Sequence, residues 1–409
     1  MKRRISLILS LITLLALPLS LFSCGKSEDS VTTLYVYNWG EYISDGSEDS
    51  YDTNAEFEKW YYKNYRKRVK VTYSTYSSNE DMYAKLTSGS VSYDVIIPSD
   101  YMIERLIDEN WLLPLNYDNI PHASNISPDF MGKDAKYDYY DKGSVYSVPY
   151  FYGMIGIIYN TTMVDEADIG SWDLMWDEKY KGNILQFNNS RDAFGTAQYK
   201  LGIDVNTKDE GQWRIALDEL KKQKDIVQGY VMDEIFNKME NGSAAIAAYY
   251  AGDFLAMYEN NEDLEFYYPK NTNLYVDAMC IPKCAQNKEI AEAYINFMCD
   301  KEAAIANAEY TYYASPNTAV TSDQDYIDYM NDIKDDGYDK IYGTDGVNAT
   351  PYRNMSGEQL ALINNLWEEL KSDIDVSPTI YILCTVIVSA LTFFAVFFTV
   401  RKRMRRKFY

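Results

Sequence analysis

The sequence contains a single histidine, His122, among 409 residues. Histidine is the usual general base and the commonest transition-metal ligand, so histidine-based catalysis and most transition-metal sites lack their normal side chain. The sequence also has no phosphate loop, no GxGxxG after a strand, no GxSxG elbow and no HExxH motif. We therefore expect no metal and no cofactor, and we assign His122, in the apparent loop NIPHASN, to a surface or packing role.

Cysteine is also scarce, with five residues in the whole chain. Cys24 and Cys384 belong to the apolar terminal segments, which leaves Cys280, Cys284 and Cys299. Three cysteines are too few for a disulfide framework in a chain of this length. The CIPKC spacing is not that of a zinc site, and no histidine lies near it.

The amino-terminal segment has the layout of an export signal, with three basic residues followed by an apolar run and small residues. Residues 21–24, LFSC, resemble a bacterial lipobox, although Phe22 is bulkier than the usual residue there. The resemblance implies a lipoprotein signal peptide over residues 1–23 and lipidation of Cys24. An uncleaved anchor and a simple secretory signal remain the alternatives.

The carboxyl-terminal segment 379–400 contains 22 residues without a charge and is followed by the basic tail 401–409. A helix of that length is about 33 Å long, enough to cross the hydrocarbon core of a bilayer. A basic flank stays in the cytoplasm, so we expect one transmembrane helix with the preceding chain outside the cell. The alternative, a buried core helix, fits the uncharged run and its basic flank less well.

Negative charge dominates the exported part of the chain. All 61 Asp and Glu lie between positions 24 and 378, whereas three of the 39 Lys and Arg precede this range and six follow it. This leaves 30 basic residues and a net charge of about −31 there. Such a field disfavours nucleic acid and anionic ligands and attracts cations, although solubility explains most of the excess.

Strand-like and helix-like segments alternate along the exported chain, which favours an α/β fold with mainly parallel sheets. Its length indicates two lobes. Residues 325–355 are polar and irregular, and Gly357–Lys371 has the spacing of an amphipathic helix. The expected strands are Thr33–Trp39, Val69–Tyr76, Tyr93–Ser99, Met154–Asn160, Ala244–Tyr250 and Tyr275–Pro282. The expected helices include Ala55–Tyr65, Glu80–Leu86 and Tyr101–Glu109.

One pattern recurs: a strand ends at an exposed aromatic or acidic residue and a helix follows. In YDVIIPSDYMIERL the apolar strand stops at Pro98, Ser99 can cap the next helix, and Tyr101 begins it. In LYVYNWGEYIS the strand runs into Trp39 and Glu41. Ligands of open α/β sheets bind outside the carboxyl ends of strands, so these side chains could converge on one crevice or could equally serve ordinary packing.

Six stretches carry a family resemblance: YNWGEYIS, YSTYSSNEDMYAKL, YDVIIPSDYMI, SVPYFYG, YVDAMCIPK and YYASPNTAV. In this order they resemble the motifs of the spermidine/putrescine-binding proteins of ABC importers, over residues 33–320. The resemblance implies a two-lobed periplasmic-binding-protein-like fold with the polyamine in the cleft between the lobes. It implies lobe 1 over 33–147, lobe 2 over 148–276, a return to lobe 1 over 277–320, and a helical segment over 321–372 packed on lobe 2.

The resemblance also implies which residues bind the ligand. Gly40 departs from the commonly hydroxylic residue of the first motif, Asn189 stands where an acid is usual, and Tyr249 and Tyr275 replace tryptophans. The implied ligand-binding residues are Trp39, Glu41, Tyr42, Ser99, Tyr101, Asn189, Asp192, Tyr249, Tyr275, Asp277 and Tyr313.

A polyamine suits this set because aromatic rings can cover its methylenes while carboxylates replace the water lost by each ammonium. We expect Asp277 to hold one amine and Asp192 or Glu41 another, with no choice between spermidine and putrescine. We expect a monomeric binding protein rather than an enzyme, with ABC permease subunits and the membrane as partners and no nucleic acid. Another cation or a sugar is the alternative ligand, and an extracellular glycoside hydrolase is the less favoured alternative.

Overall fold

The computed structural model describes residues 31–372. The expected signal peptide with Cys24, the membrane helix 379–400 and the basic tail 401–409 therefore lie outside the described residues. Between Val31 and Ser372, no helix is both long and apolar enough to cross a membrane. The chain divides into two compact units between Ser356 and Gly357. The second unit contains helix α14 (Gly357–Ser372), which confirms the amphipathic helix predicted there.

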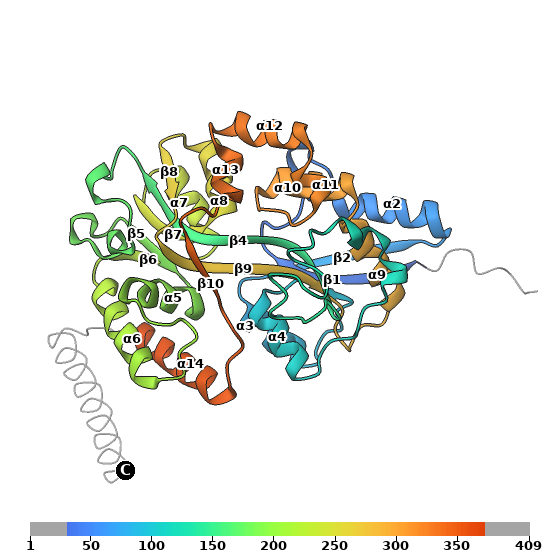
Figure 1. Ribbon diagram of the computed structural model, residues 1–409, viewed down its shortest axis with the longest axis horizontal. Helices are drawn as coiled ribbons and strands as arrows, with labels where there is room; N and C mark the ends of the chain where they lie inside the picture. The colour runs from blue at the N-terminus through green and yellow to red at the C-terminus, as the bar shows by residue number, and fades with distance from the viewer. Residues whose placement is uncertain (1–30, 373–409) are drawn as a thin grey trace, which may run out of the picture. The chain divides into compact units, whose positions relative to one another are not determined.

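The first unit is built on strands that form one continuous network of ten (Figure 1). The strands follow the order β2-β1-β3-β9-β4-β7-β5-β6, with β10 paired to β9 and β8 paired to β4. Their bounds are β1 Thr32–Trp39, β2 Val69–Tyr76, β3 Val95–Ile96, β4 Ser147–Asn160, β5 Ile184–Phe187, β6 Val227–Val231, β7 Ile246–Tyr250, β8 Leu264–Tyr267, β9 Asn271–Cys280 and β10 Asn348–Pro351.

Strands β4 and β9 join two lobes. They run antiparallel to each other, with Ser147 opposite Cys280 and Met154 opposite Leu274 (Figure 1). Beyond Met154, β4 continues into the second lobe, where it pairs with β7 and β8. The chain thus crosses between the lobes along long strands rather than through loose linkers.

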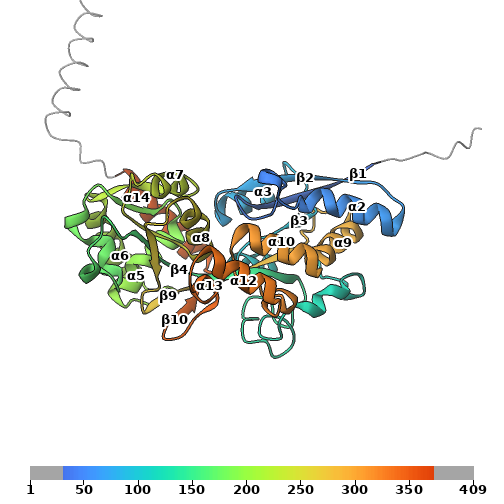
Figure 2. The same ribbon diagram turned by 90° about the horizontal axis from the view of Figure 1, so that it is seen from above.

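The first lobe contains β1, β2 and β3 and the second contains β5, β6 and β7. In each lobe the three strands are parallel to one another, because a helix follows each strand and returns the chain to the same edge. Figure 2 shows these two groups of elements on either side of β4 and β9. The helices after the strands of the first lobe are α2 Thr53–Tyr65, α3 Asn79–Thr87 and α4 Asp100–Asp108. Those of the second lobe are α5 Ser190–Leu201, α6 Glu210–Lys224, α7 Glu234–Glu240 and α8 Ala251–Asn260.

Polar side chains fix where several of these helices begin. Asp52 caps α2 by accepting a hydrogen bond from the Ala55 N–H, and Ser78 caps α3 through the Asp81 N–H. The return to the first lobe after β9 is helical, with α9 Lys288–Met298, α10 Lys301–Thr311 and α11 Thr318–Thr321. Helices α9 and α10 pack on α2, which closes the core of the first lobe.

The predicted elements agree with the structure where the apolar pattern is long. Strand β2 has its predicted bounds, and β1 differs by one residue. The expectation of mainly parallel sheets is confirmed inside each lobe. It does not hold for β4, which is antiparallel to β7, β8 and β9, nor for the pairing of β9 with β3. Strands β5, β6, β8 and β10 were not predicted, because four or five residues are too few to show a period.

The prediction of irregular structure over residues 325–355 is wrong. This stretch contains α12 Gln324–Ile333, α13 Gly337–Tyr342 and β10. Helix α12 packs on α10, α13 packs on α8 of the second lobe, and β10 runs parallel to β9. The residue pattern missed these elements because few apolar residues, such as Tyr326, Met330 and Ile341, anchor them, whereas the family resemblance implied a helical segment over 321–372.

Candidate ligand-binding site

A cavity of about 790 Å³, open to solvent, lies in the first unit where the strands of the two lobes end. The first lobe contributes residues that follow β1, β2 and β3, and the second lobe contributes residues that follow β5, β6 and β7. Parallel strands place their carboxyl ends at one edge, so segments far apart in sequence meet there. The eleven predicted ligand residues all line this cavity: Trp39, Glu41, Tyr42, Ser99, Tyr101, Asn189, Asp192, Tyr249, Tyr275, Asp277 and Tyr313.

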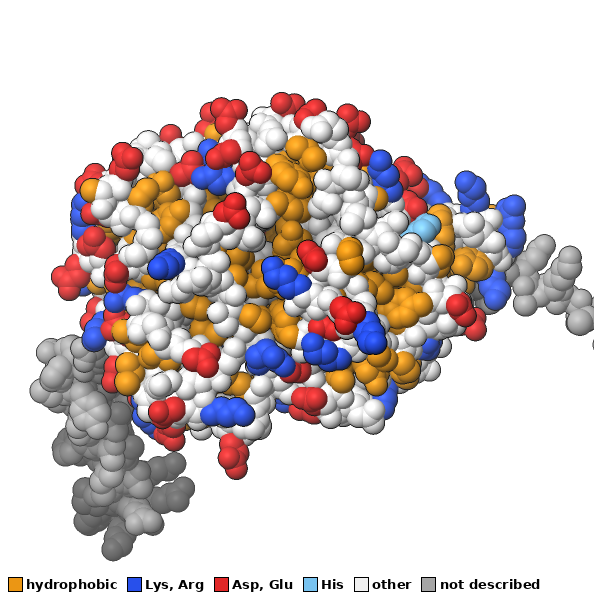
Figure 3. Space-filling model, viewed as in Figure 1, with side chains coloured by type: hydrophobic (Ala, Val, Ile, Leu, Met, Phe, Trp, Pro, Cys, Tyr) orange, Lys and Arg blue, Asp and Glu red, His pale blue; other side chains and the backbone are white. Residues whose placement is uncertain are grey.

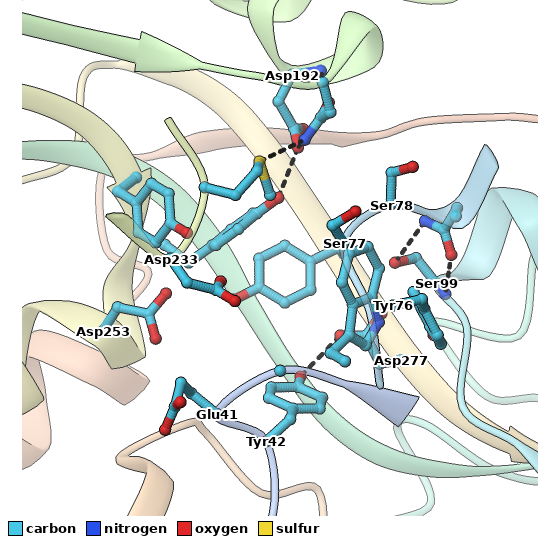
Figure 4. Close-up of a pocket in the computed structure, with 18 of the residues that line it drawn as sticks. Glu41, Tyr42, Tyr76, Ser77, Ser78, Ser99, Asp192, Asp233, Asp253 and Asp277 are labelled. Carbon is cyan, nitrogen blue, oxygen red and sulfur yellow. Dashed lines mark hydrogen bonds between the residues drawn. The ribbon is translucent and has the colours of Figure 1, made fainter. Parts of the chain in front are cut away.

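Asp277 lies on the crossing strand β9 and is only 4% exposed. The Tyr42 hydroxyl donates a hydrogen bond of 2.7 Å to Asp277 Oδ2, as Figure 4 shows. Asp277 Oδ1 is buried and accepts no hydrogen bond from any described residue. Burial raises the pKa of Asp277 to about 6, against the opposing effect of the Ser99 and Tyr42 hydroxyls. This carboxylate therefore has an unused acceptor atom in a site that disfavours its charge.

Asp192 is held by its neighbours at the start of α5. Asn189 caps this helix: its Oδ1 accepts a hydrogen bond from the Asp192 N–H, and its amide donates one of 2.7 Å to Asp192 Oδ2. The Tyr250 hydroxyl donates a further bond of 2.6 Å to Asp192 Oδ2. Burial raises the pKa of Asp192. The amide of Asn189 is thus used to orient Asp192.

Ser99 is the N-cap residue immediately before α4, as predicted, but its side chain makes no capping hydrogen bond. Its hydroxyl instead accepts a hydrogen bond of 3.0 Å from the Asn79 amide, which also donates to the Tyr101 hydroxyl. The Tyr101 hydroxyl in turn donates to Glu80 at 3.0 Å. The capping prediction is therefore wrong in detail. The Ser99 hydroxyl oxygen accepts its hydrogen bond from Asn79, at the start of α3, and not from a backbone N–H of α4.

Aromatic rings form much of the cavity wall. Trp39 stacks at a tilt against Tyr76 with 4.7 Å between ring centroids, and Tyr42 meets Tyr313 edge to face at 4.6 Å. Tyr250 packs edge to face on Tyr275 at 5.4 Å. Such faces can cover aliphatic chains and attract cations.

Acidic side chains outnumber every other charged group in the cavity. Among the described residues that line it there are seven carboxylates and no lysine or arginine. The carboxylates belong to Glu41, Glu80, Asp100, Asp192, Asp233, Asp253 and Asp277, most of them drawn in Figure 4. Loss of hydration raises the pKa of each of them, to about 8 for Asp100 and Asp253, although the side chains of Glu41 and Asp233 remain partly open to solvent. Like charge from Asp233 and Glu41 adds to the effect of burial at Asp253. Arg191, which is not among the lining residues, partly offsets the charge of Glu80 and Asp192. No basic side chain lines the described part of the cavity beside the other carboxylates.

The space-filling view shows that the outer surface differs from the cavity. On the face in Figure 3, acidic and basic side chains are interspersed, with no single acidic block. This distribution supports the interpretation that most of the excess charge serves solubility. The cavity differs in having seven carboxylates and no basic side chain among its described lining residues.

Several lining residues were missed from the sequence. Tyr250, the neighbour of the predicted Tyr249, is the residue that donates a hydrogen bond to Asp192. Asp253 accepts a 2.8 Å hydrogen bond from the Tyr313 hydroxyl. Asp233 follows the short strand β6. The rule that singled out Glu41, an acid just past a strand, would have found Asp233 had β6 been recognised. The other missed residues include Asn79, Glu80, Asp100, Met232, Phe236, Asn273 and Tyr352.

Comparison with known proteins gives consistent matches. The model of the bacterial extracellular solute-binding protein family matches residues 54–337. The spermidine/putrescine-binding periplasmic protein of Escherichia coli is 31% identical over 303 residues, covering 74% of this chain and 82% of that protein. A related Haemophilus influenzae protein of that description is 33% identical over 275 residues, covering 66% of this chain and 72% of its own.

Solved structures agree with these matches. A Listeria monocytogenes protein assigned to spermidine/putrescine ABC transport superposes with a TM-score of 0.72 at 33% identity, covering 83% of this chain and 99% of that one. The spermidine/putrescine ABC transporter substrate-binding protein of Streptococcus pneumoniae gives a TM-score of 0.63 at 32% identity, covering 83% and 98%.

Proposed function

The chain belongs to the bacterial extracellular solute-binding protein family, among the spermidine/putrescine-binding proteins of ABC importers, and on this premise we propose that it binds a polyamine. It holds the polyamine between its lobes outside the cell and delivers it to the permease of an ABC transporter. It acts by binding and release, without turnover of the ligand.

The observation that carries this proposal is the set of seven carboxylates without a lysine or arginine among the described lining residues. An ionised carboxylate removed from water needs a cation or hydrogen-bond donors to offset the loss of hydration. A polyamine brings ammonium groups joined by methylenes, and the rings of Trp39, Tyr42, Tyr275 and Tyr313 suit those methylenes. A neutral sugar would leave the charge uncompensated.

Asp277 is the anchor for one ammonium, because this residue lines the cavity, its Oδ1 is buried without a hydrogen-bond partner among the described residues, and its Oδ2 is already oriented by Tyr42. Asp192 or Glu41 receives another amine. Ser99, Tyr101, Asn189 and Tyr249 contribute hydrogen-bonding groups and ring surface to the same cavity, with Asn189 acting through Asp192. These residue roles follow from placement in the cavity and from the resemblance of the motifs.

The ligand closes the two lobes because it contacts both. Trp39 and Ser99 come from the first lobe, Asp192 and Tyr249 from the second, and Asp277 from a strand that crosses between them. A ligand shifts the equilibrium between the open and closed forms only if its affinity for the two forms differs. The closed form binds more tightly, because only there can the ligand contact both lobes at once. We place the lobe boundaries at 147/148 and 276/277, at β4 and β9.

Isothermal titration calorimetry of residues 31–372 tests the proposal directly. We expect saturable one-to-one binding of spermidine or putrescine, and no heat from maltose or thiamine. Absence of binding to both polyamines would refute the proposal, and heat with maltose would favour a sugar ligand. Hydrolysis of a glycoside panel, lost on replacing Glu41 or Asp192, would instead support the glycoside hydrolase.

The binding domain faces the outside of the cell, as the family requires, in the periplasm where an outer membrane exists. We further propose two membrane attachments, a lipid on Cys24 and a transmembrane helix over 379–400, which keep a monomeric receptor beside the permease.

Fractionation of cells tests the two attachments. We expect the Cys24→Ala variant to stay in the membrane fraction, and a Cys24→Ala chain that also ends at residue 372 to be released, provided that its signal is still cleaved. Release after Cys24→Ala alone would exclude the transmembrane helix. Retention of the doubly altered chain with its signal cleaved would show an attachment that neither the lipid nor the helix supplies.

A further inference from the structure

Gly40 of the first lobe and Asp233 of the second lobe meet across the cavity. A Cβ atom built on Gly40 would lie 2.8 Å from Asp233 Oδ2, closer than such atoms approach in folded proteins. Gly40 does not have the positive φ that often demands glycine. Glycine at this position lets the Asp233 carboxylate, the end of an exposed side chain, approach the first lobe without moving aside.

The Asp233 carboxylate makes no hydrogen bond or ion pair with another described residue. It stands at the start of α7 without capping that helix. Its charged neighbours in the cavity are acids: the like charge of Asp233 raises the pKa of Glu41 and of Asp253. Figure 4 shows Glu41, Asp233 and Asp253 together on one side of Tyr42 and Asp277.

Glu41 is held in an unusual backbone conformation beside this glycine. Its φ is 47°, in the left-handed region that few residues other than glycine adopt. The Glu41 side chain lines the cavity, where Asp233 adds like charge to it. No group of three or more acidic, cysteine or histidine side chains within residues 31–372 is close enough to hold a metal ion. A more extended cation, such as an ammonium on a flexible chain, suits these spread carboxylates better.

We propose that Gly40 admits Asp233 into the cleft and that Asp233, together with Glu41, binds a terminal ammonium of the ligand. Asp233 is then a specificity-determining residue supplied by the second lobe opposite Glu41 of the first. Like charges face each other across the cleft, and the ammonium between them joins the lobes. This inference rests on the proposed function, since it assigns a second amine site to the same ligand.

The pairing of Gly40 with Asp233 predicts a non-additive mutant cycle. Asp233→Asn keeps the shape of the side chain and removes its charge. We expect it to weaken the binding of spermidine or putrescine about tenfold, which corresponds to roughly 1.4 kcal/mol. Gly40→Ala alone should also weaken binding, because the new methyl group displaces the carboxylate. In an Asp233→Ala background, Gly40→Ala should change the affinity less than about twofold, since the atoms that it would meet are gone.

Titration calorimetry of these variants with spermidine and putrescine tests the inference, with Asp218→Asn as a matched control. Asp218 lies on α6 outside the cavity, so this change removes one charge from the same lobe without touching the site. Thermal melting of each variant without ligand shows whether it is folded. The inference would be overturned if Asp233→Asn bound the polyamine as tightly as the unaltered chain. It would also be overturned if Gly40→Ala lowered the affinity equally with Asp233 and with Asp233→Ala. Either result would leave the proposal of polyamine binding intact. If the unaltered chain binds neither polyamine, the proposed function itself fails.

Discussion

Replacing Asp277 with asparagine is expected to weaken polyamine binding by at least about thirtyfold. Removing one partner of a buried, hydrogen-bonded charge pair costs about 2–5 kcal/mol, because the other charge is left unpaired. Asp277 fits this case, since it is 4% exposed and has a free oxygen in the cavity. Titration calorimetry of Asp277→Asn against the unaltered chain measures the loss.

Melting of the Asp277→Asn variant without ligand separates binding from folding. Burial raises the pKa of Asp277 to about 6, so its ionised form opposes folding once the pH exceeds the ordinary value for aspartate. We therefore expect the variant, without ligand at pH 7.5, to melt no lower than the unaltered chain. A variant that melts normally and binds with unchanged affinity would remove Asp277 from the site.

The affinity for a polyamine is expected to fall as the pH is lowered from 8 to 5. The amines stay protonated throughout, because alkyl ammonium groups lose their proton near pH 10. Two carboxylates of the cavity do not stay ionised over this range: the pKa of Asp277, the proposed anchor, is raised to about 6 and that of the neighbouring Asp253 to about 8, in each case chiefly by burial. Protonation of Asp277 alone should lower the affinity about tenfold at pH 5.

Binding near pH 7 should also release protons, because the arriving cation favours the ionised form of Asp253. Calorimetry in two buffers with different heats of ionisation measures this release. In Asp277→Asn the part of the pH dependence centred near pH 6 should disappear, whereas Asp218→Asn should leave the profile unchanged. An affinity that is constant between pH 5 and pH 8 would contradict the raised pKa values of Asp277 and Asp253.

The spacing of apolar residues along the chain was sufficient to predict many of the strands and helices. Strands β1 and β2 and helices α2, α3 and α4 have apolar residues at regular spacing, and their predicted bounds differ from the structure by three residues or fewer. The short strands β5 and β6 gave no such signal, because their burial comes from neighbours distant in sequence. Missing β6 also hid Asp233, which follows it.

The sequence by itself determined the alternation of strands and helices, the acidic charge of the exported chain and the placement of aromatic and acidic residues after strands. These properties depend on residue type and spacing along the chain. Only the tertiary structure decided that Gly40 faces Asp233, that Asn189 is occupied with Asp192, and that Ser99 bonds to Asn79 instead of capping α4. Each of these depends on the distance between atoms of different elements, which strand order and lobe packing set and which no local pattern encodes.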